Sequence, residues 1–339
     1  MMELFILILL ASIIISVAIL IPVFLTTNRI YPYAYANARI RGMISSLLKK
    51  EDFLELVKKD YNEIIYYLEK KSFDNLSKYL SGDFSYGSVD SALRSQLVKT
   101  LLKIERISPE ESKKFVKTLL TKYDIQIIES LVRTTNTNIN NKDDVLHFTE
   151  VFSEEFLFKN KYSLNDLRNE LRGSQYEKIL VEHLDNIKNK KFADFEYDLD
   201  LFFFKRLLFE AKSFEAKKYV KTLIDTYNVS LEFKGLNRWI PSGTISKQNI
   251  KGKSLTDIRK SLNNKGYKIK GYNARQIERD LQIYLLNLGK KFLSKDPLSE
   301  STIIGFIIIK TVHNRNLNIL LKMKSEGFSQ EEISKVLAL

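Results

Sequence analysis

The sequence contains no cysteine. This absence excludes disulfide bonds, thiolate nucleophiles and metal sites with cysteine ligands. Only three histidines occur, and His147, His183 and His313 lie far apart in the chain with no histidine four residues away. Isolated histidines are more often ordinary surface or core residues than metal ligands or general bases. We therefore predict no catalytic residue, no metal site and no bound cofactor.

Glycine and proline are also scarce, with 12 and 5 among 339 residues. Both residues interrupt helices, so their scarcity favours long helices. No segment alternates apolar and polar residues in the way that a half-buried strand requires. Residues 252–254 read Gly-Lys-Ser, but Lys247 stands where a phosphate-binding loop needs glycine. The sequence predicts an all-α protein without a nucleotide-binding loop.

A repeated segment organises the body. Glu111 to Ile125 returns as Glu215 to Val229, with eight of fifteen positions identical. A weaker similarity joins residues 196–202 to residues 278–284. Stacked copies of one helical unit bury their apolar faces against each other. We predict three related helical-bundle units at residues 31–140, 141–240 and 241–339, which suit a socket or scaffold better than a catalyst.

Within these units, helical periodicity and capping residues predict the individual helices. Pro241 marks the boundary between the second and third units, and Pro297 marks the break between the two long helices of the third unit. The predicted helices are one that begins near Tyr33, then residues 51–68, 93–107, a helix carrying 111–125, 176–189, 194–211, a helix carrying 217–233, 274–293, 299–326 and 330–337.

One long apolar run precedes the repeats, from Leu4 to Leu25. It holds no charged residue, and its about 22 residues would form about 33 Å of helix. The leading Met1-Met2-Glu3 lacks the basic residues of a secretory signal, so we predict an N-terminal transmembrane anchor with its connector at residues 1–30. A basic flank stays on the cytoplasmic side of a membrane, which predicts a cytoplasmic body. The flanking basic residues are Arg29, Arg39, Arg41, Lys49 and Lys50.

The formal net charge is +13, which permits an acidic partner such as nucleic acid, lipid headgroups or a protein surface. Three consecutive phenylalanines at 202–204 could form an exposed platform on which single-stranded nucleic acid stacks. Consecutive residues point to different sides of a helix, however, so a buried helix is the simpler interpretation. The positive charge leaves one alternative function, a membrane-tethered basic scaffold that binds nucleic acid.

Several segments together resemble a known family. Tyr33 to Arg41, followed by Leu47-Leu48 and Glu51-Asp52-Phe53, resembles the opening helix of the C subunit of the archaeal A-type ATP synthases, which is homologous to the d subunit of V-type ATPases. Arg315-Asn316-Leu317 and the tail from Lys324 to Ile333 are similar to the end of that family. One departure is His313-Asn314, where the family usually has Glu-Ile or Glu-Val.

The resemblance covers residues 31–339 and implies a fold and a function. The expected fold is a funnel of three helical units on the cytoplasmic face of the membrane rotor ring, with a cavity that receives the tip of the central shaft. The expected function is that of a non-catalytic central-stalk subunit, which couples shaft and ring for ATP synthesis driven by a proton or sodium gradient. Its partners would be the proteins of the ring and the shaft, with no cofactor, nucleic acid or small-molecule substrate. Family-like positions predict partner contacts at Arg39, Arg41, Arg315 and Asn316.

Overall fold

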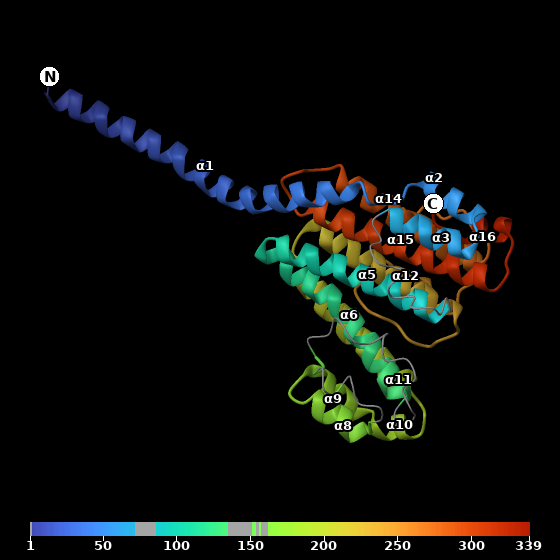
Figure 1. The fold of residues 1–339 in the computed structure, drawn as a ribbon. Coiled ribbons are helices and arrows are strands. Elements are labelled where there is room, and N and C mark those ends of the chain that lie inside the picture. The colour runs from blue at the N-terminus through green and yellow to red at the C-terminus, as the bar shows by residue number, and fades with distance from the viewer. Residues whose placement is uncertain (1, 72–85, 135–150, 154–155, 157–161) are drawn as a thin grey trace.

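The computed structural model describes the chain apart from residues 1, 72–85, 135–150, 154–155 and 157–161 (Figure 1). The described residues form helices and no strands, which confirms the all-α prediction. His147 and the predicted boundary between the first two units lie outside these residues.

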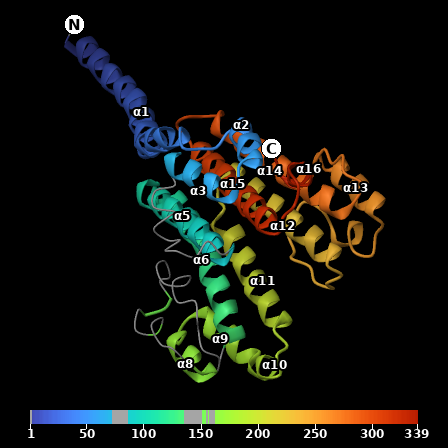
Figure 2. The same cartoon turned by 45° about the vertical axis from the view of Figure 1, so that its right-hand side comes forward.

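Three helix pairs make up the centre of the body, and their large shared core joins residues from all three (Figures 1 and 2). The pairs are α5 (Tyr86–Ile107) with α6 (Glu110–Thr134), α11 (Ala193–Glu210) with α12 (Phe214–Phe233), and α14 (Ala274–Leu293) with α15 (Ser301–Ser325). The predicted helix at 274–293 has these bounds in the structure.

The turns that join the helices of each pair lie at one end of the body, here called the turn end. Its three turns are residues 108–109, 211–213 and 294–300. The Glu300 carboxylate, at the start of α15, makes hydrogen bonds with Ser112 of α6 and with Ser213 at the start of α12. The N-terminal ends of the three second helices therefore converge on one acidic residue.

The first helix, α1 (Met2–Ile44), leaves the body at this end (Figure 1). Its inner half is anchored by Asn37, whose Nδ2 donates to the carbonyl oxygens of Pro297 at 2.7 Å and Ser299 at 2.9 Å. The predicted connector at the end of residues 1–30 is wrong, because α1 continues without a break through Pro22 and Pro32. A proline inside a helix removes one hydrogen bond and can bend the helix without ending it.

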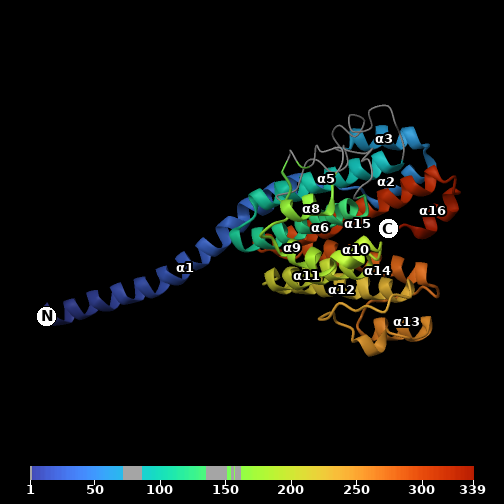
Figure 3. The same cartoon turned by 90° about the horizontal axis from the view of Figure 1, so that it is seen from below.

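The outer half of α1 projects away from the other helices (Figures 1 and 3). Its described apolar side chains are exposed, such as Ile14 and Phe24 at 66% and 65%. Across the parts of the chain that the structure describes, no helix is both long and apolar enough to cross a membrane. The predicted transmembrane anchor at residues 4–25 is therefore not supported.

Smaller helices surround the three pairs. One group packs on the far end of α15 in a second core, a second group forms a lobe at the far end of α6 and α11, and a third lies outside α12 and α14 (Figures 2 and 3). The first group is α2 (Lys50–Lys58), α3 (Tyr61–Lys70) and α16 (Gln330–Val336). The second is α8 (Leu164–Glu170), α9 (Gln175–Glu182) and α10 (Leu184–Lys188), and the third is η1 (Lys247–Asn249) and α13 (Leu255–Asn264).

Candidate functional site

The repeat seen in α6 and α12 extends to α15 when the buried polar residues are placed in register. Tyr123-Asp124-Ile125 of α6 corresponds to Tyr227-Asn228-Val229 of α12 and to Arg315-Asn316-Leu317 of α15. The middle residue of each triplet is buried, with exposed fractions of 8%, 1% and 0%. The three second helices therefore present equivalent positions to the interior.

The middle residues of α12 and α15 make the same interaction. Asn228 donates from Nδ2 to the Ile240 carbonyl oxygen and accepts from the Ile240 N–H, both at 2.8 Å. Asn316 donates to the Ala338 carbonyl oxygen at 2.7 Å and accepts from the Ala338 N–H at 3.1 Å. Each asparagine thus makes hydrogen bonds with the N–H and the carbonyl oxygen of one backbone residue in the segment that follows its helix pair. These bonds fix that segment to the core.

The first residues of the same triplets line a cavity of about 340 Å³ among the three pairs, here called the socket. Leu119 and Tyr123, Leu223 and Tyr227, and Thr311 and Arg315 lie at equivalent positions on α6, α12 and α15. Their spacing of four residues places each pair on one face of its helix. Three related helix faces therefore surround a single cavity.

The walls of the socket are mainly apolar and aromatic, with few charges. Lys122 forms an ion pair with Asp200, and the Tyr227 hydroxyl donates to the same carboxylate. The Lys122 ammonium also lies 5.6 Å from the centroid of the Phe203 ring. These charged groups hold each other in place, because Asp200 is only 6% exposed and has two partners.

Arg315 is the third charged group of the socket. Burial lowers the pKa of its guanidinium, and the carboxylate of Glu278 partly opposes that effect. Glu278 and Gln282 of α14 line the same cavity. Arg315 also lines a second cavity of about 340 Å³ next to the socket.

This second cavity, here called the mouth, lies toward the end opposite the turn end, between the beginning of α5 and the last part of α15. It shares Tyr123 and Thr311 with the socket. Three buried polar atoms that belong to lining residues have no hydrogen-bond partner among the described residues: Gln126 Oε1, Arg315 Nη1 and Asn318 Oδ1. Buried polar atoms are rarely left unpaired, so these three favour a polar partner at the mouth.

The four predicted contact residues do not form one site. Arg315 lies between socket and mouth, whereas Asn316 is fully buried and engaged with Ala338. Arg39 and Arg41 are exposed on α1 near the turn end. Sequence reasoning missed Lys122, Tyr227 and Glu278, although the register of the repeat would have identified Tyr227.

Within the described residues, no group of three or more His, Asp and Glu side chains could hold a metal ion. His183 pairs with Asp198 at 2.7 Å, and burial lowers the pKa of His313 to about 3. Phe203 and Phe204 are 5% and 6% exposed, so a stacking platform for nucleic acid at residues 202–204 is not supported.

Comparison with known proteins identifies the family of the chain. The chain is 25% identical to the C subunit of the A-type ATP synthase of Methanocaldococcus jannaschii, over 90% of this chain and 86% of that protein. It is 23% identical to the protein of the same name from Methanosphaera stadtmanae, over 96% of this chain and 92% of that protein. It is 27% identical to the protein of the same name from Methanococcoides burtonii, over 91% of this chain and 94% of that protein. The model of the ATP synthase (C/AC39) subunit family matches residues 36–336, and the chain therefore belongs to that family.

Proposed function

We propose that the protein is a non-catalytic central-stalk subunit of a rotary ATP synthase of the A type. In this role it joins the rotor shaft to the membrane ring and passes torque between them. The names of its relatives and the match to the family support this assignment. The observation that carries it is the socket, where equivalent faces of three related helices surround one cavity.

The socket and mouth suit the end of a rod-shaped shaft. Three related faces around one axis can hold such an end on all sides. The faces are not identical, because Tyr123, Tyr227 and Arg315 occupy the equivalent positions. A round and uniform socket would let the shaft slip, whereas one unequal side fixes its rotational position. The unpaired atoms of Gln126, Arg315 and Asn318 would then bond to polar groups of the shaft.

The turn end is the proposed seat on the membrane ring, since it lies opposite the mouth. Large apolar side chains are exposed at or beside its turns: Phe209 at 69%, Phe214 at 67% and Leu298 at 43%. Exposed apolar groups that gather at one end of a protein are typical of an interaction surface. Arg41 on the neighbouring part of α1 is a proposed ring contact, whereas Arg39 lines a separate cavity between α1 and α5. With this seat the body lies on the cytoplasmic face of the cell membrane.

Stiffness is the second requirement of torque transfer. The three pairs share one packed core, and packed interiors resist compression. The ends of the second helices are fixed as well, through Glu300 at one end and through Asn228 and Asn316 farther along. A body whose helices are fixed at several points along their length transmits twist rather than absorbing it.

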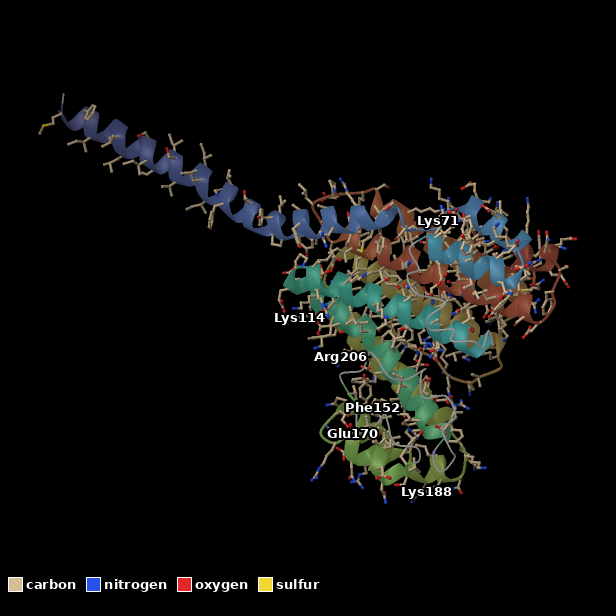
Figure 4. The ribbon with its side chains drawn as sticks, viewed as in Figure 1. Lys71, Lys114, Phe152, Glu170, Lys188 and Arg206 are labelled. Atoms are coloured by element: carbon tan, nitrogen blue, oxygen red, sulfur yellow. The ribbon has the colours of Figure 1, made fainter. Side chains whose placement is uncertain are left out.

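The absence of cysteine makes a crosslinking test direct, because one introduced cysteine is unique in this chain. Asn318→Cys would report on the mouth, Leu298→Cys on the turn end, and Lys188→Cys on the far tip of the lobe (Figure 4). In the assembled synthase, we expect crosslinks from residue 318 to the shaft and from residue 298 to the ring. Lys188→Cys is the control and should reach neither. Crosslinks from residue 318 to the ring, or equal labelling of all three cysteines, would contradict the assignment of the two ends.

A further inference from the structure

A separate cavity of about 530 Å³ lies between α1 and α5, beside the turn end. Ala38, Arg39, Gly42 and Met43 of α1 and Lys103, Arg106 and Ile107 of α5 line it. We call it the basic cavity, because all of its charged lining residues are cations. It shares no lining residue with the socket or the mouth.

The charges of the basic cavity are not neutralised locally. Arg39, Lys103 and Arg106 make no ion pair within 4.0 Å with any carboxylate in the described part of the chain. By contrast, the neighbouring Lys113 lies 3.9 Å from Glu105. Lys103 also adds to the effect of burial in lowering the pKa of Lys310 to about 8. The cavity therefore has a positive potential that an anion would relieve.

Gly42 lines the cavity and leaves free space beside its Cα atom. A Cβ atom at this glycine would meet no atom within 4 Å, so the space is large enough to admit a ligand group there. Arg39 and Arg106 line the cavity and are exposed, so each can offer parallel N–H groups to phosphate oxygens, which is the geometry that arginine recognises best. The chemistry of the cavity thus fits a phosphate group.

The position of the cavity along α1 indicates the source of that phosphate. Apolar exposed side chains occupy α1 up to Phe24, two exposed tyrosines follow at 31 and 35, and Arg39 comes next. Apolar, aromatic and basic residues occur in this order where a protein meets the acyl chains, the interface and the headgroups of a lipid layer. This order favours contact of α1 with a lipid surface and does not require a span.

We propose that the basic cavity binds the phosphate of an anionic phospholipid, with Arg39, Lys103 and Arg106 as its ligands. The outer half of α1 lies against the same lipid layer and brings the headgroup to the cavity. Such a bound lipid would fix α1 to α5 at the turn end. Lipid binding of this kind goes beyond the stalk role and does not depend on it.

The test uses the full-length chain and flotation with two kinds of vesicle, phosphatidylcholine alone and phosphatidylcholine mixed with phosphatidylglycerol. The readout is the ratio of the two affinities, which removes any contribution from the apolar part of α1. Arg39→Gln combined with Arg106→Gln should reduce this preference for anionic vesicles by roughly tenfold or more, since each basic group near a lipid surface contributes on the order of 1 kcal/mol. Gly42→Trp should also reduce it, because the side chain fills the cavity while every charge remains.

The matched control is Lys114→Gln (Figure 4) combined with Lys217→Gln in the first turn of α12; both lysines are exposed and neither lines the cavity. This pair removes the same charge but no ligand of the phosphate. It should lower the preference for anionic vesicles by about threefold or less, because salt screens charges that do not contact the phosphate. Equal losses in the two double variants, or an unchanged preference in Gly42→Trp, would overturn the proposal in favour of diffuse surface attraction. Inorganic phosphate should not abolish the preference of the unmodified chain; if it does, the cavity holds free phosphate and the lipid assignment fails.

Discussion

Gly289 of α14 and Gly305 of α15 lie opposite each other where the two helices make backbone contact. A Cβ atom on Gly305 would lie 2.7 Å from the carbonyl oxygen of Gly289 and 2.5 Å from the backbone nitrogen of Leu293. A Cβ atom on Gly289 would lie 3.0 Å from the carbonyl oxygen of Gly305. Only glycine fits at this crossing, and its backbone neighbours cannot move aside as a flexible side chain could.

Gly305→Ala should therefore destabilise the protein. Overpacking of a core contact costs typically about 1–3 kcal/mol, and the backbone contact places this variant at the upper end. Urea unfolding followed by circular dichroism would measure the loss. Gly42→Ala is the control, because its Cβ meets nothing within 4 Å and alanine favours the helix. An unchanged midpoint for Gly305→Ala would show that the two helices can separate without cost.

Asn316→Ala should release the C-terminal segment. The variant removes both hydrogen bonds to Ala338 and leaves its buried N–H and carbonyl oxygen unpaired, at a cost of about 1–3 kcal/mol. Hydrogen exchange should accelerate in α16 more than in α11, which lies far from the change. Ser334→Ala, at an exposed position in α16, should leave exchange unchanged. Uniform acceleration across the chain would contradict a local role for Asn316.

Glu300 should make stability depend on pH. Burial raises the pKa of its carboxyl group, and Glu111 and Glu215 add to this effect, while hydrogen bonds from Ser213 and Ser112 oppose it. The folded state therefore favours the protonated acid. The resulting stabilisation is fully present below the unfolded pKa and is lost as the pH rises through the higher folded pKa.

Glu300→Gln mimics the protonated acid and should raise Tm by a few degrees at pH 7. The difference from the unmodified chain should shrink as the pH falls toward 4.5, the ordinary glutamic acid value. Thermal scans at several pH values would measure it, with Glu110→Gln at an exposed position as the control. A gain of the same size at every pH would argue against titration of Glu300.

Arg315→Gln should weaken binding of the shaft without unfolding the chain. The guanidinium is already disfavoured by burial, so its removal costs little stability, but it eliminates a charged group between socket and mouth. We expect shaft affinity to fall about tenfold or more, as for a buried charged contact at an interface. Co-purification and Tm would be measured together. Arg168→Gln, in the distal lobe, is the control, and equal losses of shaft in both variants would contradict the proposed socket.

Much of the architecture could be predicted from local sequence. The helix at 274–293 begins after Asn273, whose side chain accepts from the Gln276 N–H, so its start follows from a cap within the segment. The repeat likewise predicted the second helices, because copies of one sequence pattern form one structure. The predicted helix at 176–189 is instead interrupted at His183, which separates α9 from α10. The predicted helix at 51–68 is interrupted at residues 59–60, which separate α2 from α3.

The sequence by itself determined the all-α class, the recurring helix pairs and the apolar character of the chain before Leu25. These properties depend on propensities and periodicities within one helix. Only the tertiary structure decided that α1 continues through Pro32, that Glu300 meets Ser112 and Ser213, and that the buried Asn316 binds Ala338. Those outcomes depend on contacts between distant segments, whose desolvation and hydrogen bonding no local pattern encodes.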